Sequence, residues 1–328
     1  MITVLHQAAQ DARLAPSILN TQPWRWQVHD DVLDLYADAD RRLPEVDPHG
    51  RLMTLSCGAA LHHARVALAA AGFEPAVDRL PDAGRPLLLA RIRDCRPRPA
   101  TQENLAAYRS MRLRHTDRRL FAQGMPVPGE VLDQLRVAAE AEGARLHLLQ
   151  QQDVVYLGYA AQGAHKVGAH DPRAAEELHR WTHRGADAPD GVPPGTVAGA
   201  ADRPVPLRDF GLGDEAALSP GAGDDADAVY LVVATARDEP LDWLVSGEAV
   251  SAVWLMATAR GLAGSPMTDV VETPGARVLV RSLLQPPGQP QLVLRLCVAQ
   301  TPAPPGSPRR PAADTVTVTE GRSSGEGV

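Results

Sequence analysis

The chain has 328 residues, of which 44% are hydrophobic and 22% charged. These proportions are those of a globular protein and exclude a wholly disordered or fibrous chain. The length exceeds that of one ordinary domain, so we expect two compact units or one unit built from two similar halves. The formal net charge of −7 excludes a chain-wide electrostatic footprint for nucleic acid.

Targeting and redox signals are sparse. No run of 18 apolar residues occurs in the sequence, and residues 1–16 lack the basic end, apolar stretch and cleavage site of a signal peptide. We therefore expect a cytoplasmic protein with no membrane partner. Cys57, Cys95 and Cys297 lie far apart without metal-ligand spacing, and we interpret them as buried thiols.

The first part of the chain alternates helical and strand patterns. Periodicity predicts a helix over 2–14, strands over 24–28 and 32–36, a buried alanine-rich helix over 52–71 and a buried strand over 86–92. Pro16 ends the first of these helices and Gly72 the second.

The second part begins near Glu103 and repeats this order on a larger scale. The predicted elements are helices over 128–142, within 154–183 and over 241–260, and strands over 145–149, 229–235 and 291–298. Between them, residues 185–227 are rich in Gly, Pro, Ala and Asp, and a segment of that length is either functional or disordered. From 301 onward, Pro, Arg, Ser and Gly predict a loosely held tail.

An internal repeat connects the two parts. CGAALHHARVALAAAG over 57–72 aligns with SGEAVSAVWLMATARG over 246–261 at a constant offset of 189, which matches Gly58 with Gly247 and Gly72 with Gly261. Two unrelated alanine-rich helices would explain the match less well, because a strand also follows each helix. The pattern favours duplication.

The sequence APSILNTQPW over 15–24 is the most specific local signal. It places a hydroxyl, two amides and a large aromatic side chain on a proline-started turn, which would suit a flat polar ligand. A simple helix-to-strand connection, in which Ser17 and Asn20 satisfy backbone groups, is an equally good interpretation from the residues alone.

Several motifs together resemble the FMN-dependent nitroreductase family. These are APS with NxQPW at 15–24, RHTDR at 114–118, GLAGSPM at 261–267 and the closing LVLRL with Arg295. The asparagine loop precedes the arginine motif here, and this order, with DPxGR before the helix at 57–72, resembles the fused actinobacterial Acg-like branch. The resemblance spans residues 1–312.

The resemblance implies an α+β, nitroreductase-like fold in which two tandem halves form an intramolecular pseudo-dimer around central buried helices. The halves would be residues 1–106 and 107–300, with a lid-like insertion at 185–227 and a loosely ordered tail at 301–328. One FMN per chain is implied, because the counterpart site lacks both an RxTxR motif and a second NxQPW.

The same resemblance implies the site. The flavin ring carries the hydride chemistry, so no catalytic side chain is expected. Arginine would grip the FMN phosphate, since its guanidinium forms paired charge-assisted hydrogen bonds. The implied cofactor-binding residues are Pro16, Ser17, Asn20, Gln22, Arg114, Thr116, Arg118, Met267, Thr268 and Arg295.

Two functions are consistent with these features. The first is an oxidoreductase that transfers hydride from NAD(P)H through FMN to a small electrophile such as a nitroaromatic or quinone. The alternative is a protein that stores or sequesters FMN under the lid with little turnover. We expect small-molecule partners, no nucleic acid, and a monomeric pseudo-dimer or a weak homodimer.

Other cofactor sites find less support. His179 and His183 have helical spacing compatible with a metal, yet no HExxH or cysteine accompanies them, so we expect no metal site. No GxGxxG follows a strand and no phosphate-loop GK[ST] occurs, so a Rossmann dinucleotide site is not predicted.

Overall fold

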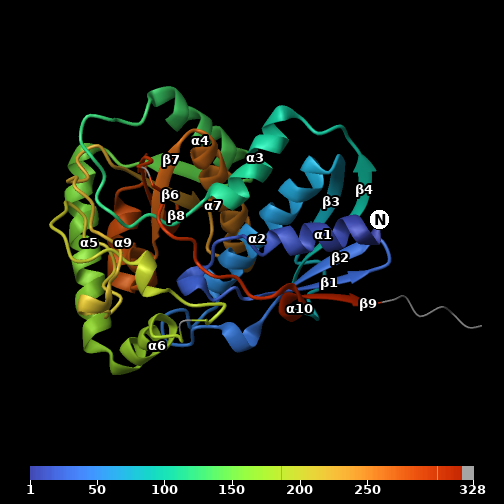
Figure 1. Cartoon of the computed structure of the whole chain (residues 1–328), viewed down its shortest axis with the longest axis horizontal. Helices are drawn as coiled ribbons and strands as arrows, with labels where there is room; N and C mark the ends of the chain where they lie inside the picture. Colours follow the sequence, from blue (N-terminus) through green and yellow to red (C-terminus); the bar gives the residue numbers. More distant parts are fainter. Residues whose placement is uncertain (186, 301, 320–328) are drawn as a thin grey trace, which may run out of the picture.

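The computed structural model describes residues 1–185, 187–300 and 302–319. Two sheets lie on opposite sides of the long helices α2 (Arg51–Ala70) and α7 (Pro240–Ala259) in Figure 1. The fold is thus a mixture of α and β elements organised around a central helix pair.

The first sheet has the strand order β3-β4-β2-β1-β9. Its strands are β1 (Trp24–His29), β2 (Val32–Ala37), β3 (Phe73–Arg79), β4 (Leu88–Pro97) and β9 (Val316–Thr319). Trp24 and Trp26 alternate with exposed residues along β1 and are fully buried, as expected for a strand with one face on the core. β3 was not predicted from the sequence.

The second sheet is antiparallel throughout and has the order β5-β6-β8-β7. Its strands are β5 (Arg145–Leu148), β6 (Val229–Thr235), β7 (Leu262–Met267) and β8 (Gln289–Val298). The central strands β6 and β8 are buried along almost their whole length, which explains their continuous apolar sequences.

Helices cover both sheets. The remaining α-helices are α1 (Ile2–Ala12), α3 (Gln102–Leu113), α4 (Gly129–Ala141), α5 (Gln151–His170), α6 (Pro172–Thr182), α8 (Asp269–Glu272), α9 (Pro274–Ser282) and α10 (Ala312–Thr315). Short 3₁₀ turns occupy Ile18–Asn20, Ala39–Arg41, Pro194–Thr196 and Gly213–Glu215. Over the described residues, no helix is both long and apolar enough to cross a lipid bilayer.

The central helices α2 and α7 pack at two glycines. A Cβ added to Gly58 would collide with the carbonyl oxygen of Leu244, and one added to Gly247 would collide with that of Leu55. One turn further along, the buried imidazoles of His62 and His63 both reach the Ser251 hydroxyl, at 2.8 and 2.9 Å. The two helices predicted to be buried therefore pack on each other, as the family resemblance implied.

The described part of the insertion, residue 185 and residues 187–227, contains little regular structure but is packed. Val197, Val205, Phe210 and Leu212 are all buried, and Ala198 forms a parallel bridge with Leu218. The apolar residues scattered along this segment thus have partners in the fold, as a purely disordered linker would not.

Residues 302–319 differ from the sequence-based expectation of a loosely held tail, and the rest of that predicted tail, residues 301 and 320–328, lies outside the described residues. Residues 302–319 cross from the second sheet to the first, where β9 pairs in parallel with β1 (Figure 1). Arg13 donates a hydrogen bond to the Arg310 carbonyl at 2.6 Å, which ties this crossing segment to the end of α1. Composition alone missed the strand, because its partner lies at the other end of the sequence.

Candidate functional site

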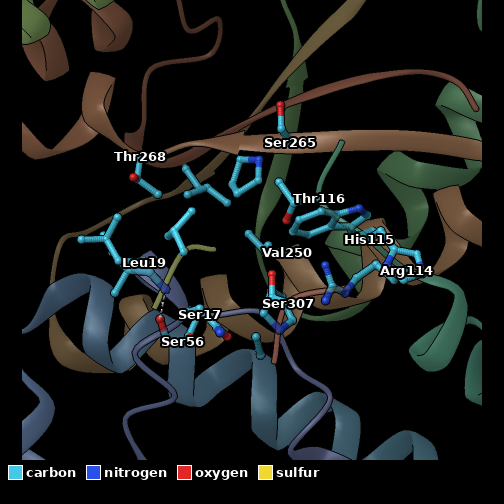
Figure 2. Close-up of a pocket in the computed structure, with 18 of the residues that line it drawn as sticks. Ser17, Leu19, Ser56, Arg114, His115, Thr116, Val250, Ser265, Thr268 and Ser307 are labelled. Carbon is cyan, nitrogen blue, oxygen red and sulfur yellow. Dashed lines mark hydrogen bonds between the residues drawn. The ribbon is translucent and has the colours of Figure 1, made fainter. Parts of the chain in front are cut away.

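A pocket opens between the central helices, the loop at 15–20 and the second sheet. Figure 2 shows Ser17 and Ser56 on one side of it, Ser265 and Thr268 on the opposite side, and Arg114 with Thr116 on a third. Residues 306, 307 and 309 of the C-terminal segment and residues 192, 207, 208 and 210 of the insertion complete the wall. The wall thus combines segments from both ends of the chain.

The structure brings eight of the ten predicted cofactor-binding residues to this pocket. These are Pro16, Ser17, Asn20, Arg114, Thr116, Arg118, Met267 and Thr268. Gln22 and Arg295 are fully buried elsewhere and do not line it.

The loop at 15–24 has an unusual backbone. Leu19, Asn20 and Gln22 all have left-handed conformations, with φ of 44°, 54° and 50°. Non-glycine residues in this region cost roughly 1–3 kcal/mol each and cluster where a ligand is bound. Two serine hydroxyls hold the turn: Ser17 accepts from the Gln22 amide at 2.9 Å and Ser56 from the Ile18 amide at 3.1 Å.

Asn20 and Gln22 connect this loop to distant segments. The Asn20 side-chain amide donates to the Gly191 carbonyl at 3.0 Å and to the Pro308 carbonyl at 3.1 Å. Gln22 donates to the Pro189 carbonyl at 2.9 Å and accepts from the Arg310 amide at 2.8 Å. Both amides therefore hold the insertion and the C-terminal segment against the loop.

Arg114 is the most informative side chain of the pocket. It is 7% exposed and stacks on Trp254 with 4.5 Å between the guanidinium carbon and the ring centroid. Its Nε and Nη1 atoms have no hydrogen-bond partner among the described residues. Burial, reinforced by the charge of Arg309, lowers its pKa to about 9. A buried cation with unused donors requires an anion, because an unpaired buried charge is costly.

Two further arginines face the same space. Arg118 donates to the Thr196 carbonyl at 2.9 Å and stacks on Phe210 at 4.8 Å. Arg309 donates to the carbonyl of Leu14 and to the side-chain oxygen of Asn20. Burial lowers the pKa of each guanidinium to about 10, and no carboxylate is hydrogen-bonded to either in the part of the chain that is described. Arg114, Arg118 and Arg309 therefore concentrate positive charge in this pocket, with no carboxylate hydrogen-bonded to any of the three among the described residues.

Comparison with known proteins agrees with the sequence motifs. No family model matches the chain. It is 36% identical over 315 residues to a Mycobacterium tuberculosis protein provisionally named NAD(P)H nitroreductase acg, with 94% of this chain and 93% of the relative covered. It is also 36% identical over 318 residues to Rv3131 of the same organism, which carries the same provisional activity name, with 92% and 88% covered.

The chain belongs to this nitroreductase family. The similarity covers more than nine-tenths of the chain. Among solved structures, an FMN-bound nitroreductase from Bacteroides fragilis covers 65% of this chain and 98% of its own, at 12% identity and a TM-score of 0.41. That likeness is too low to support a conclusion.

Arg295 makes structural contacts away from the pocket. Its Nη1 forms an ion pair with Asp225 at 2.6 Å, its Nη2 donates to the Asp117 and Arg119 carbonyls, and its guanidinium stacks on Phe121. Both side chains of the ion pair are completely buried. Arg295 is therefore already neutralised, and a role in holding phosphate stays a prediction without geometric support.

Sequence reasoning missed several residues of the pocket. Arg309 lies in a proline-rich stretch whose composition predicts a tail. Trp254 and Ser56 lie in helices whose apolar sequences predict only a role in the core. The available sequence signal for Arg309 was the pair Arg309-Arg310, because two adjacent arginines stand out in a segment of otherwise apolar and small residues. Nothing local indicated Trp254 as a stacking partner.

Proposed function

We propose that this protein is an FMN-binding oxidoreductase that transfers hydride from NAD(P)H through the flavin to a small electrophile, a nitroaromatic or a quinone. The observation that carries the proposal is Arg114, a buried guanidinium with two unused donor atoms at the wall of a cationic pocket. Membership of a family whose relatives are named NAD(P)H nitroreductases supplies the donor and acceptor classes.

The residues present fit FMN. Arg114, with Arg118 and Arg309, would hold the phosphate, since a dianion satisfies unused guanidinium donors and offsets their charge. The loop with Ser17 and Asn20 and the backbone near Thr268 would bind the polar edge of the ring. When bound, FMN supplies the hydride chemistry, and these side chains bind it, orient it and exclude water.

The two halves would form an intramolecular pseudo-dimer, residues 1–106 and 107–300. Contacts between equivalent positions support this arrangement: Gly58 packs on Gly247, and His62 is hydrogen-bonded to Ser251, each pair 189 positions apart. Residues that contact their own equivalents lie on a two-fold axis in a dimer. We therefore expect one FMN per chain and a monomer or a weak homodimer.

FMN storage is the second candidate function, and the insertion favours it. Phe210 stacks on Arg118, and Val192, Leu207 and Arg208 also line the pocket, so residues 185–227 would act as a lid. A lid that stays closed over the ring would obstruct NAD(P)H.

Anaerobic stopped-flow mixing of the FMN-loaded protein with NADPH, and separately with NADH, distinguishes the two functions. An oxidoreductase loses its oxidised-flavin absorbance within the time of turnover. A storage protein keeps it, and persistent absorbance with both nucleotides would overturn the proposed activity.

A further inference from the structure

A second cavity adjoins the cofactor pocket. It lies between α5, α6 and residues 208–211 of the insertion, with α8 at its inner side. Arg208, Phe210 and Asp269 line both cavities, so these three residues form the partition between them. The two cavities thus share a wall made by these three residues.

The two cavities differ in charge. Arginines dominate the cofactor pocket, where Asp269 is the only carboxylate among the lining residues. The second cavity has one arginine, Arg208, and five carboxylates: Glu45, Asp171, Asp209, Asp269 and Glu272. Three histidines, His165, His179 and His183, also face it. The second cavity is therefore acidic at neutral pH and repels anions.

Glu272 provides evidence of a ligand that is independent of this acidity. Its side chain is 9% exposed, and its Oε2 atom forms an ion pair with Arg208. Its Oε1 atom is buried and has no hydrogen-bond partner within the described residues. A buried carboxylate oxygen left without a donor is costly, so the site is completed by a cation or a hydrogen-bond donor.

The partition has the features of a gate. Arg208 is held by Glu272 and lies 3.4 Å from the Thr268 hydroxyl, and Phe210 is held by its stack on Arg118. Both residues belong to a segment without helices longer than one turn and can move without unfolding an element. A cation that binds Glu272 competes with Arg208 for the same carboxylate and thereby loosens the partition.

We propose that the second cavity is the entrance for the electron acceptor, and that it selects planar heteroaromatic cations over neutral acceptors and neutral acceptors over anions. The inference rests on the proposed oxidoreductase function. Uptake of one hydride, which NAD(P)H supplies through that activity, converts a singly charged cation of this class into a neutral product. The product then has less attraction to the carboxylates, which favours its release.

The test compares three acceptors: the N-methylphenazinium cation, neutral menadione and anionic naphthoquinone sulfonate. For Glu272→Gln and for Asp209→Asn we expect kcat/KM to fall at least fivefold with the cation, to stay within twofold with menadione and to rise with the sulfonate. Glu130→Gln, an exposed position on α4 outside both cavities, is the matched control and should change none of the three.

Calorimetry of N-methylphenazinium binding to the oxidised protein, without NAD(P)H, gives a readout independent of turnover. The cation should bind the parent at least fivefold more tightly than either Glu272→Gln or Asp209→Asn. Equal binding of the cation to the parent and the variants, or an equal loss of kcat/KM with all three acceptors, would contradict the proposal that the second cavity is the entrance.

FMN content and flavin bleaching by NAD(P)H are measured on the same samples, so failure of the proposed oxidoreductase activity is seen separately. If Glu272→Gln does not fold, Asp209→Asn, an exposed substitution, decides alone.

Discussion

Gly58 of α2 and Gly247 of α7 lie against each other, and a Cβ on Gly58 would come within 3.0 Å of the Gly247 Cα. The same Cβ would collide with the Leu244 carbonyl. Neither helix can therefore accept a side chain at the crossing without moving apart.

Gly58→Ala should lower the free energy of unfolding by about 1–3 kcal/mol, because overpacking at a rigid backbone contact cannot be relieved by a rotamer change. Urea unfolding followed by circular dichroism measures the loss. Gly163→Ala in α5 is the matched control, since its Cβ would meet no atom within 4 Å. A helical alanine at such a position should stabilise by up to about 1 kcal/mol. Equal effects of the two substitutions would refute the close crossing.

Arg114→Gln should weaken FMN binding by roughly 10- to 100-fold, the equivalent of about 1.5–3 kcal/mol for hydrogen bonds to a charged group. The expected cause is loss of a pocket-lining guanidinium with two donor atoms that have no partner among the described residues. Fluorescence titration of the apoprotein with FMN measures the change. Arg96→Gln, on an exposed part of the first sheet, serves as the control. An unchanged Kd for Arg114→Gln would remove this residue from the site.

Arg295→Gln should lower the free energy of unfolding. Breaking a completely buried ion pair costs about 3–5 kcal/mol, and the value should lie near the lower end because Arg203 remains 3.5 Å from Asp225. Thermal unfolding of the apoprotein would show this loss. The double variant Arg295→Leu, Asp225→Leu should recover only part of it, since both charges of the buried pair are removed but the buried Arg203 then loses Asp225. A variant of normal stability with weakened FMN binding would instead support the phosphate role that the sequence motif implied.

The sequence specified the central elements more fully than the site. Apolar runs and the offset of 189 predicted α2, α7, β6 and β8, because a buried element must be apolar along its length. Strand β9 has no such signal, since its identity as a strand comes from pairing with β1. Arg295 illustrates the same limit: its partner Asp225 lies in an aperiodic segment, so no local pattern showed that the charge was already paired.

Stability should fall in mild acid because of the central histidines. Burial lowers the pKa of His62 to about 4 from an ordinary value of 6.5, with Glu142 opposing and Arg65 adding to the shift, and burial also lowers the pKa of His63 well below its usual range. The unfolded chain then binds more protons than the folded one, so stability is present above pH 6.5 and is lost toward pH 4. His62 alone accounts for up to about 3 kcal/mol over that window.

Urea unfolding at pH 7.5 and pH 5.0 measures this dependence. His62→Gln should flatten it, since the glutamine retains a polar contact without titrating. If the parent and the variant lose the same stability between these pH values, protonation of His62 does not contribute.

Deleting residues 196–222 should raise the rate of flavin reduction by NAD(P)H and loosen FMN. The segment includes Phe210, which stacks on Arg118, and Arg208, which lines the pocket. Stopped-flow reduction and FMN titration measure the two effects on one preparation. If neither the rate nor the retention changes, the insertion is not a lid.

Equilibrium titration of the apoprotein with FMN tests the central claim most directly. The cationic pocket that the described residues form, with Arg114 at its wall, predicts saturation at one FMN per chain and little binding of riboflavin, which lacks the phosphate. Saturation at two equivalents, or equal affinity for riboflavin and FMN, would contradict the assignment of the arginine pocket to a single flavin phosphate.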